Sequence, residues 1–153
     1  MNQETKEALK DFFSAQIKLT QLGIIQSRDY IGDIGKYLCK VMYNLELPKR
    51  GWQARQAHYD GYDGMIGTSK IQVQVNNCPI GSPVTLDEPF EYDELIVVLA
   101  PNCKLRPENI HDDFIFYKFT RDEALKKFRL PNGKYIGGRS LFSQGHDKVL
   151  NLT

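Results

Sequence analysis

The sequence lacks the features of a membrane or secreted protein. No apolar run approaches the roughly 18–20 residues that span a bilayer. The N-terminal stretch MNQETKEALK is polar and of mixed charge, with no apolar signal-peptide core behind it. Cys39, Cys78 and Cys103 are an odd number without CxxC spacing, which argues against a disulfide framework or a zinc site and favours buried or half-buried thiols. We therefore expect a cytoplasmic protein without a membrane partner.

Several catalytic signatures are also missing. The chain has no HExxH, GxSxG or Cys–His signature and no P-loop spacing, and its three histidines share no metal-ligand spacing. Hydrolase classes that use a covalent nucleophile therefore have no support from the sequence.

The net charge is close to zero, but the charged residues are unevenly distributed along the chain. Twenty basic and nineteen acidic residues give +1, which taken alone argues against a nucleic-acid-binding protein. Residues 87–103, however, hold five acidic and no basic side chains, while residues 104–153 hold ten basic and six acidic ones. The acidic cluster conceals moderately basic flanks, so the average charge does not exclude nucleic acid.

The length of 153 residues and the order of the expected elements indicate one domain of the α/β (α+β) class, with a small mixed sheet flanked by helices. We divide it into an N-terminal helix within 1–26, a core over 29–128 and an irregular C-terminal tail over 129–153. No repeat and no linker divides the chain.

Apolar spacing predicts a helix over 3–22 and a second helix that begins at a cap on Ser27 or Asp29. Gly32 and Gly35 lie inside the second helix. Each costs up to about 1 kcal/mol relative to alanine in an exposed helix interior, so we infer that another element packs closely there.

A β-hairpin is predicted around the turn Gly67-Thr68-Ser69, and its second strand alternates with period two. Ile71, Val73 and Val75 should point to one face of that strand, and Lys70, Gln72 and Gln74 to the other.

Two further strands and a helix are expected after the hairpin. The apolar run 94–101 is typical of a central strand buried on both faces, and 114–119 is a further strand. Thr120 and Glu123 form a capping box that opens the next helix.

Asp63 precedes the hairpin, and Gln72 and Gln74 follow on its second strand with i, i+2 spacing. Metal-dependent nucleases need a carboxylate that anchors Mg²⁺, a second oxygen ligand on the next strand and a lysine two residues later. The chain here resembles the PD-(D/E)XK nuclease superfamily, whose fold is restriction-endonuclease-like. The resemblance covers about residues 31–128 and depends on IGDIGKYL, GYDG, KIQVQV and the order of the elements.

The resemblance implies a Mg²⁺-dependent phosphodiesterase, an endonuclease-like hydrolase. The resemblance implies that Asp63 is the metal anchor, that Gln72 is the second ligand and that Asp33 is an auxiliary acid. Gln72 can still offer an amide oxygen, but Gln74 cannot supply the ammonium charge of the motif lysine. We hypothesise that Lys70, on the same strand face, replaces it.

The alternative is a catalytically inactive nuclease fold that serves as a nucleic-acid-binding or protein-interaction module, such as an inhibitor or assembly subunit. Both alternatives remain open at this point.

Partners are suggested by two charged segments. The segment with Lys49, Arg50, Trp52 and Arg55 combines basic and aromatic side chains, the composition of a nucleic-acid-binding loop. We expect DNA rather than RNA, with specificity supplied by a homodimer or a protein partner. The acidic residues 87–94 have three alternative interpretations: a solvated loop, a site for a basic protein partner, or a mimic of nucleic-acid charge.

Overall fold

The computed structural model describes residues 1–49 and 61–153. Two helices come first, α1 (Gln3–Gln21) and α2 (Tyr30–Tyr43). The Asp29 side chain accepts a hydrogen bond from the Gly32 backbone N–H at 3.0 Å, so it is the cap of α2. Asn44 ends α2 in the left-handed conformation, with φ 57°.

Two β-sheets follow these helices along the chain. The main sheet has the order β1-β2-β4-β5-β7, in which β2 and β4 are parallel and the other neighbours antiparallel. Its strands are β1 (Gly64–Ile66), β2 (Ser69–Asn76), β4 (Glu94–Leu99), β5 (Phe114–Thr120) and β7 (Lys148–Leu150). A small second sheet pairs β3 (Val84–Thr85) with β6 (Ile136–Gly137). The predicted mixed α/β class is confirmed.

The hairpin and the central strand form where the sequence predicts them. Gly67 has φ 59° in the turn between β1 and β2, a conformation that glycine adopts without steric cost. The register pairs Met65 with Lys70. Leu95 to Leu99 of β4 are each fully buried, which confirms a strand covered on both faces.

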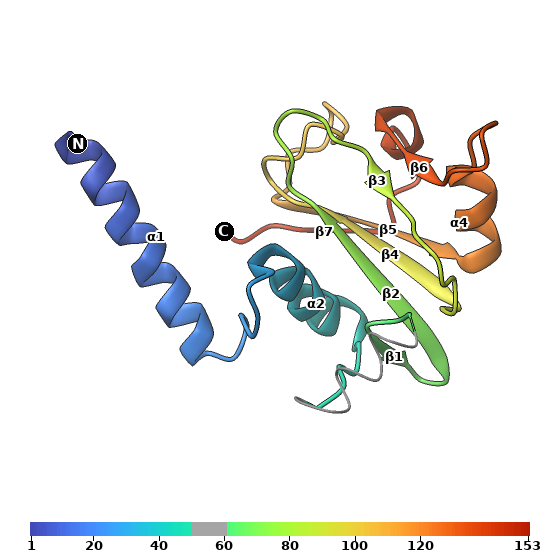
Figure 1. The fold of residues 1–153 in the computed structure, drawn as a ribbon, viewed down its shortest axis with the longest axis horizontal. Helices are drawn as coiled ribbons and strands as arrows, with labels where there is room; N and C mark the ends of the chain where they lie inside the picture. The colour runs from blue at the N-terminus through green and yellow to red at the C-terminus, as the bar shows by residue number, and fades with distance from the viewer. Residues whose placement is uncertain (50–60) are drawn as a thin grey trace.

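The main sheet separates two hydrophobic cores (Figure 1). On one face, α2 packs against β2 through residues such as Leu38 and Cys39, which meet Ile71 and Val73. On the other face lies α4 (Arg121–Phe128), which begins with the predicted Thr120–Glu123 capping box. Ala124 and Phe128 of α4 are fully buried there. The side chains of β2 therefore enter two different environments.

At Gly35, α2 lies very close to β2. A Cβ atom there would lie 2.1 Å from Cγ2 of Val75, a distance that real Cβ contacts do not show. This explains a glycine inside the helix, as the sequence indicated. Gly32 has a different reason, because its Cβ would collide with the Asp29 side chain that caps the helix.

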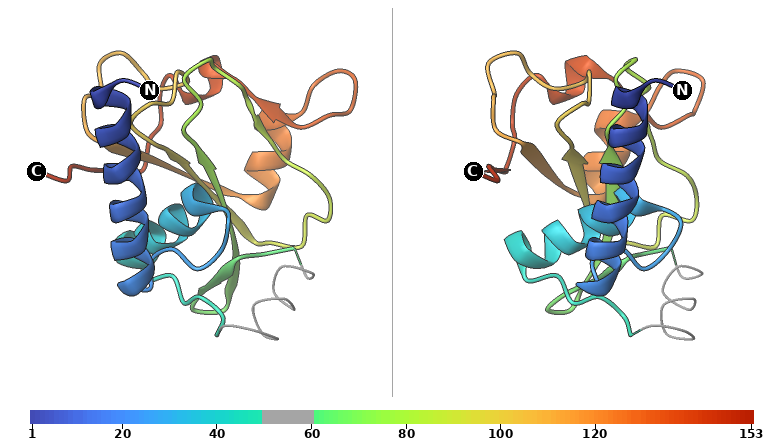
Figure 2. Two further views of the ribbon diagram at one scale, coloured as in Figure 1. Left: turned by 60° about the vertical axis from the view of Figure 1, so that its left-hand side comes forward. Right: turned by 90° about the vertical axis from the view of Figure 1, so that its left-hand side faces the viewer.

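Helix α1 stands apart from the sheet (Figures 1 and 2). It meets the start of α2 at Tyr30, whose hydroxyl accepts a hydrogen bond from Gln16 and whose ring lies 6.4 Å from that of Phe12. Phe13 and Ile17 are more than half exposed. Across residues 1–49 and 61–153, no helix has both the length and the apolar content needed to cross a bilayer.

The expectation of an irregular tail over 129–153 is wrong in part. The tail contains β6, the short 3-10 helix η1 (Arg139–Phe142) and β7, which extends the main sheet beyond β5. These elements are too short to show periodicity. Their positions depend on contacts with distant residues, such as the Tyr117 hydroxyl that donates to the Phe142 carbonyl oxygen.

The three cysteines are free. Cys39 and Cys103 are buried, as expected, and burial raises the pKa of both thiols, that of Cys39 to about 12. Cys78 lies in the loop after β2 and is half-buried. Hydrogen bonds from the Ser82 side chain, and from backbone N–H groups of the same loop, lower the pKa of the Cys78 thiol to about 7.

Replacing Gly35 by alanine should destabilise the protein, because the added methyl group overlaps Val75. We expect a loss of about 1–3 kcal/mol in the free energy of unfolding, measured by urea denaturation. Gly138→Ala is the matched control, since no atom lies within 4 Å of its added Cβ. Equal effects of the two substitutions would contradict this account of Gly35.

Cys78 should be the first thiol that iodoacetamide alkylates in the folded protein, because the thiolate is the nucleophile. We expect its rate to rise with pH through a midpoint near pH 7, while Cys39 and Cys103 stay protected. Mass spectrometry of peptides from a pH series measures this. Ser82→Ala should move the Cys78 midpoint to higher pH, and an unchanged midpoint would contradict the assigned cause.

Candidate functional site

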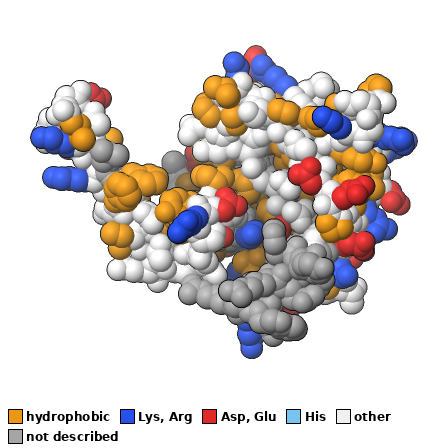
Figure 3. All heavy atoms as spheres, viewed as in Figure 1, with side chains coloured by type: hydrophobic (Ala, Val, Ile, Leu, Met, Phe, Trp, Pro, Cys, Tyr) orange, Lys and Arg blue, Asp and Glu red, His pale blue; other side chains and the backbone are white. Residues whose placement is uncertain are grey.

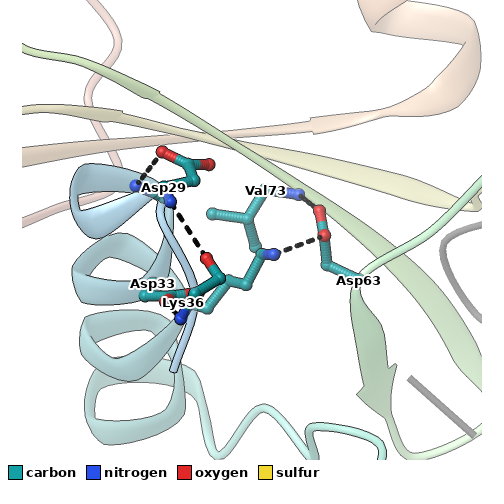
Figure 4. A network of polar contacts seen from close by, with 7 residues as sticks. Asp29, Asp33, Lys36, Asp63 and Val73 are labelled. Carbon is teal, nitrogen blue, oxygen red and sulfur yellow. Dashed lines mark hydrogen bonds and ion pairs between the residues drawn. The ribbon is translucent and has the colours of Figure 1, made fainter. Parts of the chain in front are cut away.

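The Asp63 carboxylate lies at the edge of β2, immediately before β1, and both of its oxygens are engaged (Figure 4). Oδ2 accepts a hydrogen bond from the Val73 backbone N–H at 2.8 Å. Oδ1 lies 3.3 Å from Nζ of Lys36, which reaches it from α2. The Asp63 side chain is only 11% exposed. This carboxylate thus joins the hairpin to α2.

Lys36 is the residue at this site that the sequence analysis missed. In the second helix, the resemblance implied only an acidic metal ligand, Asp33. Lys36 lies three positions later, a spacing that places two side chains on neighbouring parts of one helix face. The spacing therefore groups Lys36 with Asp33, but nothing in the sequence indicates that the Lys36 ammonium group reaches Asp63.

Asp33 has a structural role in the turn between α1 and α2. Its Oδ2 atom accepts hydrogen bonds from the backbone N–H groups of Gln26 and Ser27, at 2.7 and 2.6 Å. Figure 4 shows Asp33 on α2 with these bonds directed into the turn, while Lys36 reaches across to Asp63. No contact joins Asp33 to Asp63 within the described part of the chain.

Gln72 and Gln74 lie on the other face of β2 and line a cavity of about 300 Å³, which we call the glutamine pocket. Neither amide has a hydrogen-bond partner within residues 1–49 and 61–153. The residues that line the glutamine pocket come from three segments of the chain: Gly61, Tyr62, Gln72, Gln74, Leu86, Asp87, Glu88, Pro89 and Tyr92.

Two close contacts position the walls of this pocket. Gly61 has φ 79°, and a Cβ there would lie 3.0 Å from the Pro89 carbonyl oxygen, so only glycine allows the two segments to approach. The start of β4 is fixed through Asp93, whose carboxylate accepts from the Lys70 N–H and whose own N–H donates to the Lys70 carbonyl oxygen, each at 2.8 Å.

Lys70 lies beside the glutamine pocket but does not contact Asp63. Its Nζ atom is 5.3 Å from the centre of the Tyr62 ring, a cation–π distance. The predicted alternation of Lys70, Gln72 and Gln74 is consistent with Tyr62 and the two glutamines lining one cavity. The cation that neutralises Asp63 is instead Lys36.

To bind a magnesium ion together with Gln72, Asp63 would have to give up its ion pair with Lys36. Both oxygens of Asp63 already have partners, and the Lys36 ammonium group occupies the approach to Oδ1. Throughout the described residues, no three His, Cys, Asp or Glu side chains form a group that could hold a metal ion.

The predicted nucleic-acid-binding segment can be assessed at one position. Lys49 is exposed. Arg50, Trp52 and Arg55 lie outside the described residues, so that prediction stands as the sequence left it.

No protein-family model and no curated protein sequence matches this chain. The resemblance to the PD-(D/E)XK superfamily therefore depends on the residues and the order of elements alone, and it stays a prediction.

Asp63→Ala should destabilise the fold more than Lys36→Met. The alanine leaves the Val73 N–H without a partner, which costs about 1–3 kcal/mol, whereas a partly exposed ion pair contributes about 0–1 kcal/mol. Asp63→Asn keeps an acceptor for Val73 and should resemble Lys36→Met. Urea denaturation of the three variants measures the order. A Lys36→Met loss as large as that of Asp63→Ala would contradict this division.

Proposed function

We propose that this protein is a non-catalytic binding module, an interaction protein built on a nuclease-like arrangement of elements. The observation that carries the proposal is the engagement of both Asp63 oxygens, by Lys36 and by the Val73 N–H. A carboxylate in this state stabilises the junction between α2 and the hairpin. It would have to lose its ion pair before it could bind a metal ion.

The chemistry of the glutamine pocket supports the same proposal. Position 74, where the resemblance implies a lysine, is a neutral glutamine, and the pocket that it lines includes Asp87 and Glu88. Two carboxylates that line the pocket repel a phosphate group because like charges repel, although both are exposed and partly screened by solvent. The pocket is thus better suited to a donor-rich or cationic group than to a scissile phosphodiester.

A second candidate is the Mg²⁺-dependent endonuclease that the resemblance implies, and one observation favours it. Lys36 brings an ammonium group to 3.3 Å from Asp63, so α2 supplies a positive charge of the kind that Gln74 cannot provide. In this candidate Asp63 anchors the metal, Gln72 is the second ligand and Lys36 stabilises the developing charge, in place of Lys70.

A cleavage assay separates the two candidates. Wild-type protein is incubated with Mg²⁺ or Mn²⁺ and with single-stranded, double-stranded and branched DNA, and with RNA. We expect no cleavage above the buffer control, and no metal-dependent rise in melting temperature, because the Asp63 oxygens are not free to bind the ion.

The matched variants identify the source of any activity. Cleavage by wild type that is lost in both Asp63→Asn and Lys36→Met would overturn the binding proposal and establish the endonuclease. Cleavage only by Gln74→Lys would mean that the nuclease layout is intact apart from that residue, which agrees with a non-catalytic wild-type protein.

A further inference from the structure

The glutamine pocket contains several hydrogen-bonding groups that the fold itself does not use. Gln72 and Gln74 each present a primary amide to it, and neither amide is bonded within the described part of the chain. A primary amide has one acceptor oxygen and two N–H donors. Side chains that only fill a sheet face are usually apolar, as Leu95 and Val97 are on the adjacent strand. Two adjacent polar side chains at this position therefore need a ligand or water.

The Tyr92 hydroxyl adds a stronger indication. Tyr92 lines the same pocket and is 2% exposed. Of the buried side-chain polar atoms that the structure describes, its hydroxyl oxygen is the one without a hydrogen-bond partner. Burial also raises the pKa of this phenol, so it stays neutral and can accept or donate a hydrogen bond. A buried hydroxyl without a partner is costly in the free protein, which a bound ligand would relieve.

The charged residues that line the pocket are acidic, and Lys70 lies beside it. Asp87 and Glu88 line it, both are exposed, and neither has an ion-pair partner within residues 1–49 and 61–153. The later acids of the same segment are already used: Asp93 binds the Lys70 N–H, and Glu94 pairs with Lys118 at 2.8 Å. None of the lining residues is basic. Figure 3 shows several acidic side chains on the right of the view, with lysine and arginine side chains beside them.

A group that is cationic, planar and rich in donors would match the carboxylates and the amide oxygens of this lining. A guanidinium group has five N–H donors in a fixed plane, is less strongly hydrated than an ammonium group and packs well on aromatic rings. The residues that line the pocket include two primary amides, the Tyr92 phenol and two carboxylates. The Lys70 ammonium group already lies 5.3 Å from the centre of the Tyr62 ring. An arginine side chain matches this set better than lysine does, because lysine has only three donors at one point.

We propose that the glutamine pocket receives an arginine side chain from a basic segment of a partner protein. Gln72, Gln74 and Tyr92 would bond the guanidinium group inside the pocket, and Asp87 and Glu88 would supply the charge at its entrance. The inference names the partner class of the proposed binding module and rests on that proposal. It also assigns a role to the acidic segment that is distinct from a solvated loop.

The test uses the full chain and a short peptide with one central arginine among glycine and serine residues. The matched probe has citrulline, a neutral isostere, in place of arginine. We expect the arginine peptide to shift the side-chain amide NMR signals of Gln72 and Gln74, and the citrulline peptide to leave them unchanged. Adenosine monophosphate is the third probe, since glutamine side chains also recognise adenine.

Two substitutions at neighbouring acids provide the control. Glu88→Gln removes a charge that lines the pocket and should weaken peptide binding about fivefold. Glu91→Gln removes a charge from an exposed residue of the same segment that does not line the pocket, and should leave affinity unchanged. Tyr92→Phe should weaken binding without lowering the melting temperature of the free protein, because the lost hydroxyl has no partner there.

The outcomes separate the inference from the function on which it rests. Equal shifts with citrulline, equal effects of Glu88→Gln and Glu91→Gln, or signals that respond only to adenosine monophosphate would overturn the arginine site. So would a failure of both peptides to shift any signal. DNA cleavage in the separate assay would overturn the binding module instead, and it would not change what the peptide titration measures.

Discussion

Strand β2 pairs with β1 on one side and with β4 on the other, so its side chains can reach only the two faces of the sheet. Ile71, Val73 and Val75 pack on the face under α2, so Gln72 and Gln74, which alternate with them, must face the opposite side. A shift of one residue in register would bury the glutamines against α2 and expose the valines. The hydrophobic contact of α2 with β2 thus fixes where the glutamine pocket forms, and Gly35 sets how close that contact is.

Local patterns allowed the sequence to predict the elements around this strand. The hairpin turn, the buried strand β4 and the Thr120–Glu123 capping box are each encoded within a few neighbouring residues, so one sequence was enough to place them. The end strands β6 and β7 were not predicted, because two- and three-residue strands have no periodicity and form only when their partners are present.

The candidate site was harder to predict, for a related reason. The alternation along β2 indicated that Gln72 and Gln74 share a face, but not what lies opposite them. That wall comes from residues 86–92, and the ion pair of Asp63 comes from Lys36, 27 positions earlier in the chain. Both depend on how α2 and the segment before β4 pack against the sheet. Spacing in one sequence contains no information on such long-range contacts.

The acidic groups near β2 differ in burial and in ion pairing. Asp63 is mostly buried, and its carboxylate is bonded to the Val73 N–H and paired with the partly exposed Lys36, so its charge is used within the fold. Asp87 and Glu88 remain hydrated, and no basic group is paired with them in the described residues, so their field extends into the pocket and into solvent. A lysine at position 74 would neutralise that field from inside the pocket. The glutamine that weakens the case for phosphodiester cleavage is therefore the same residue that keeps the pocket open to a cation.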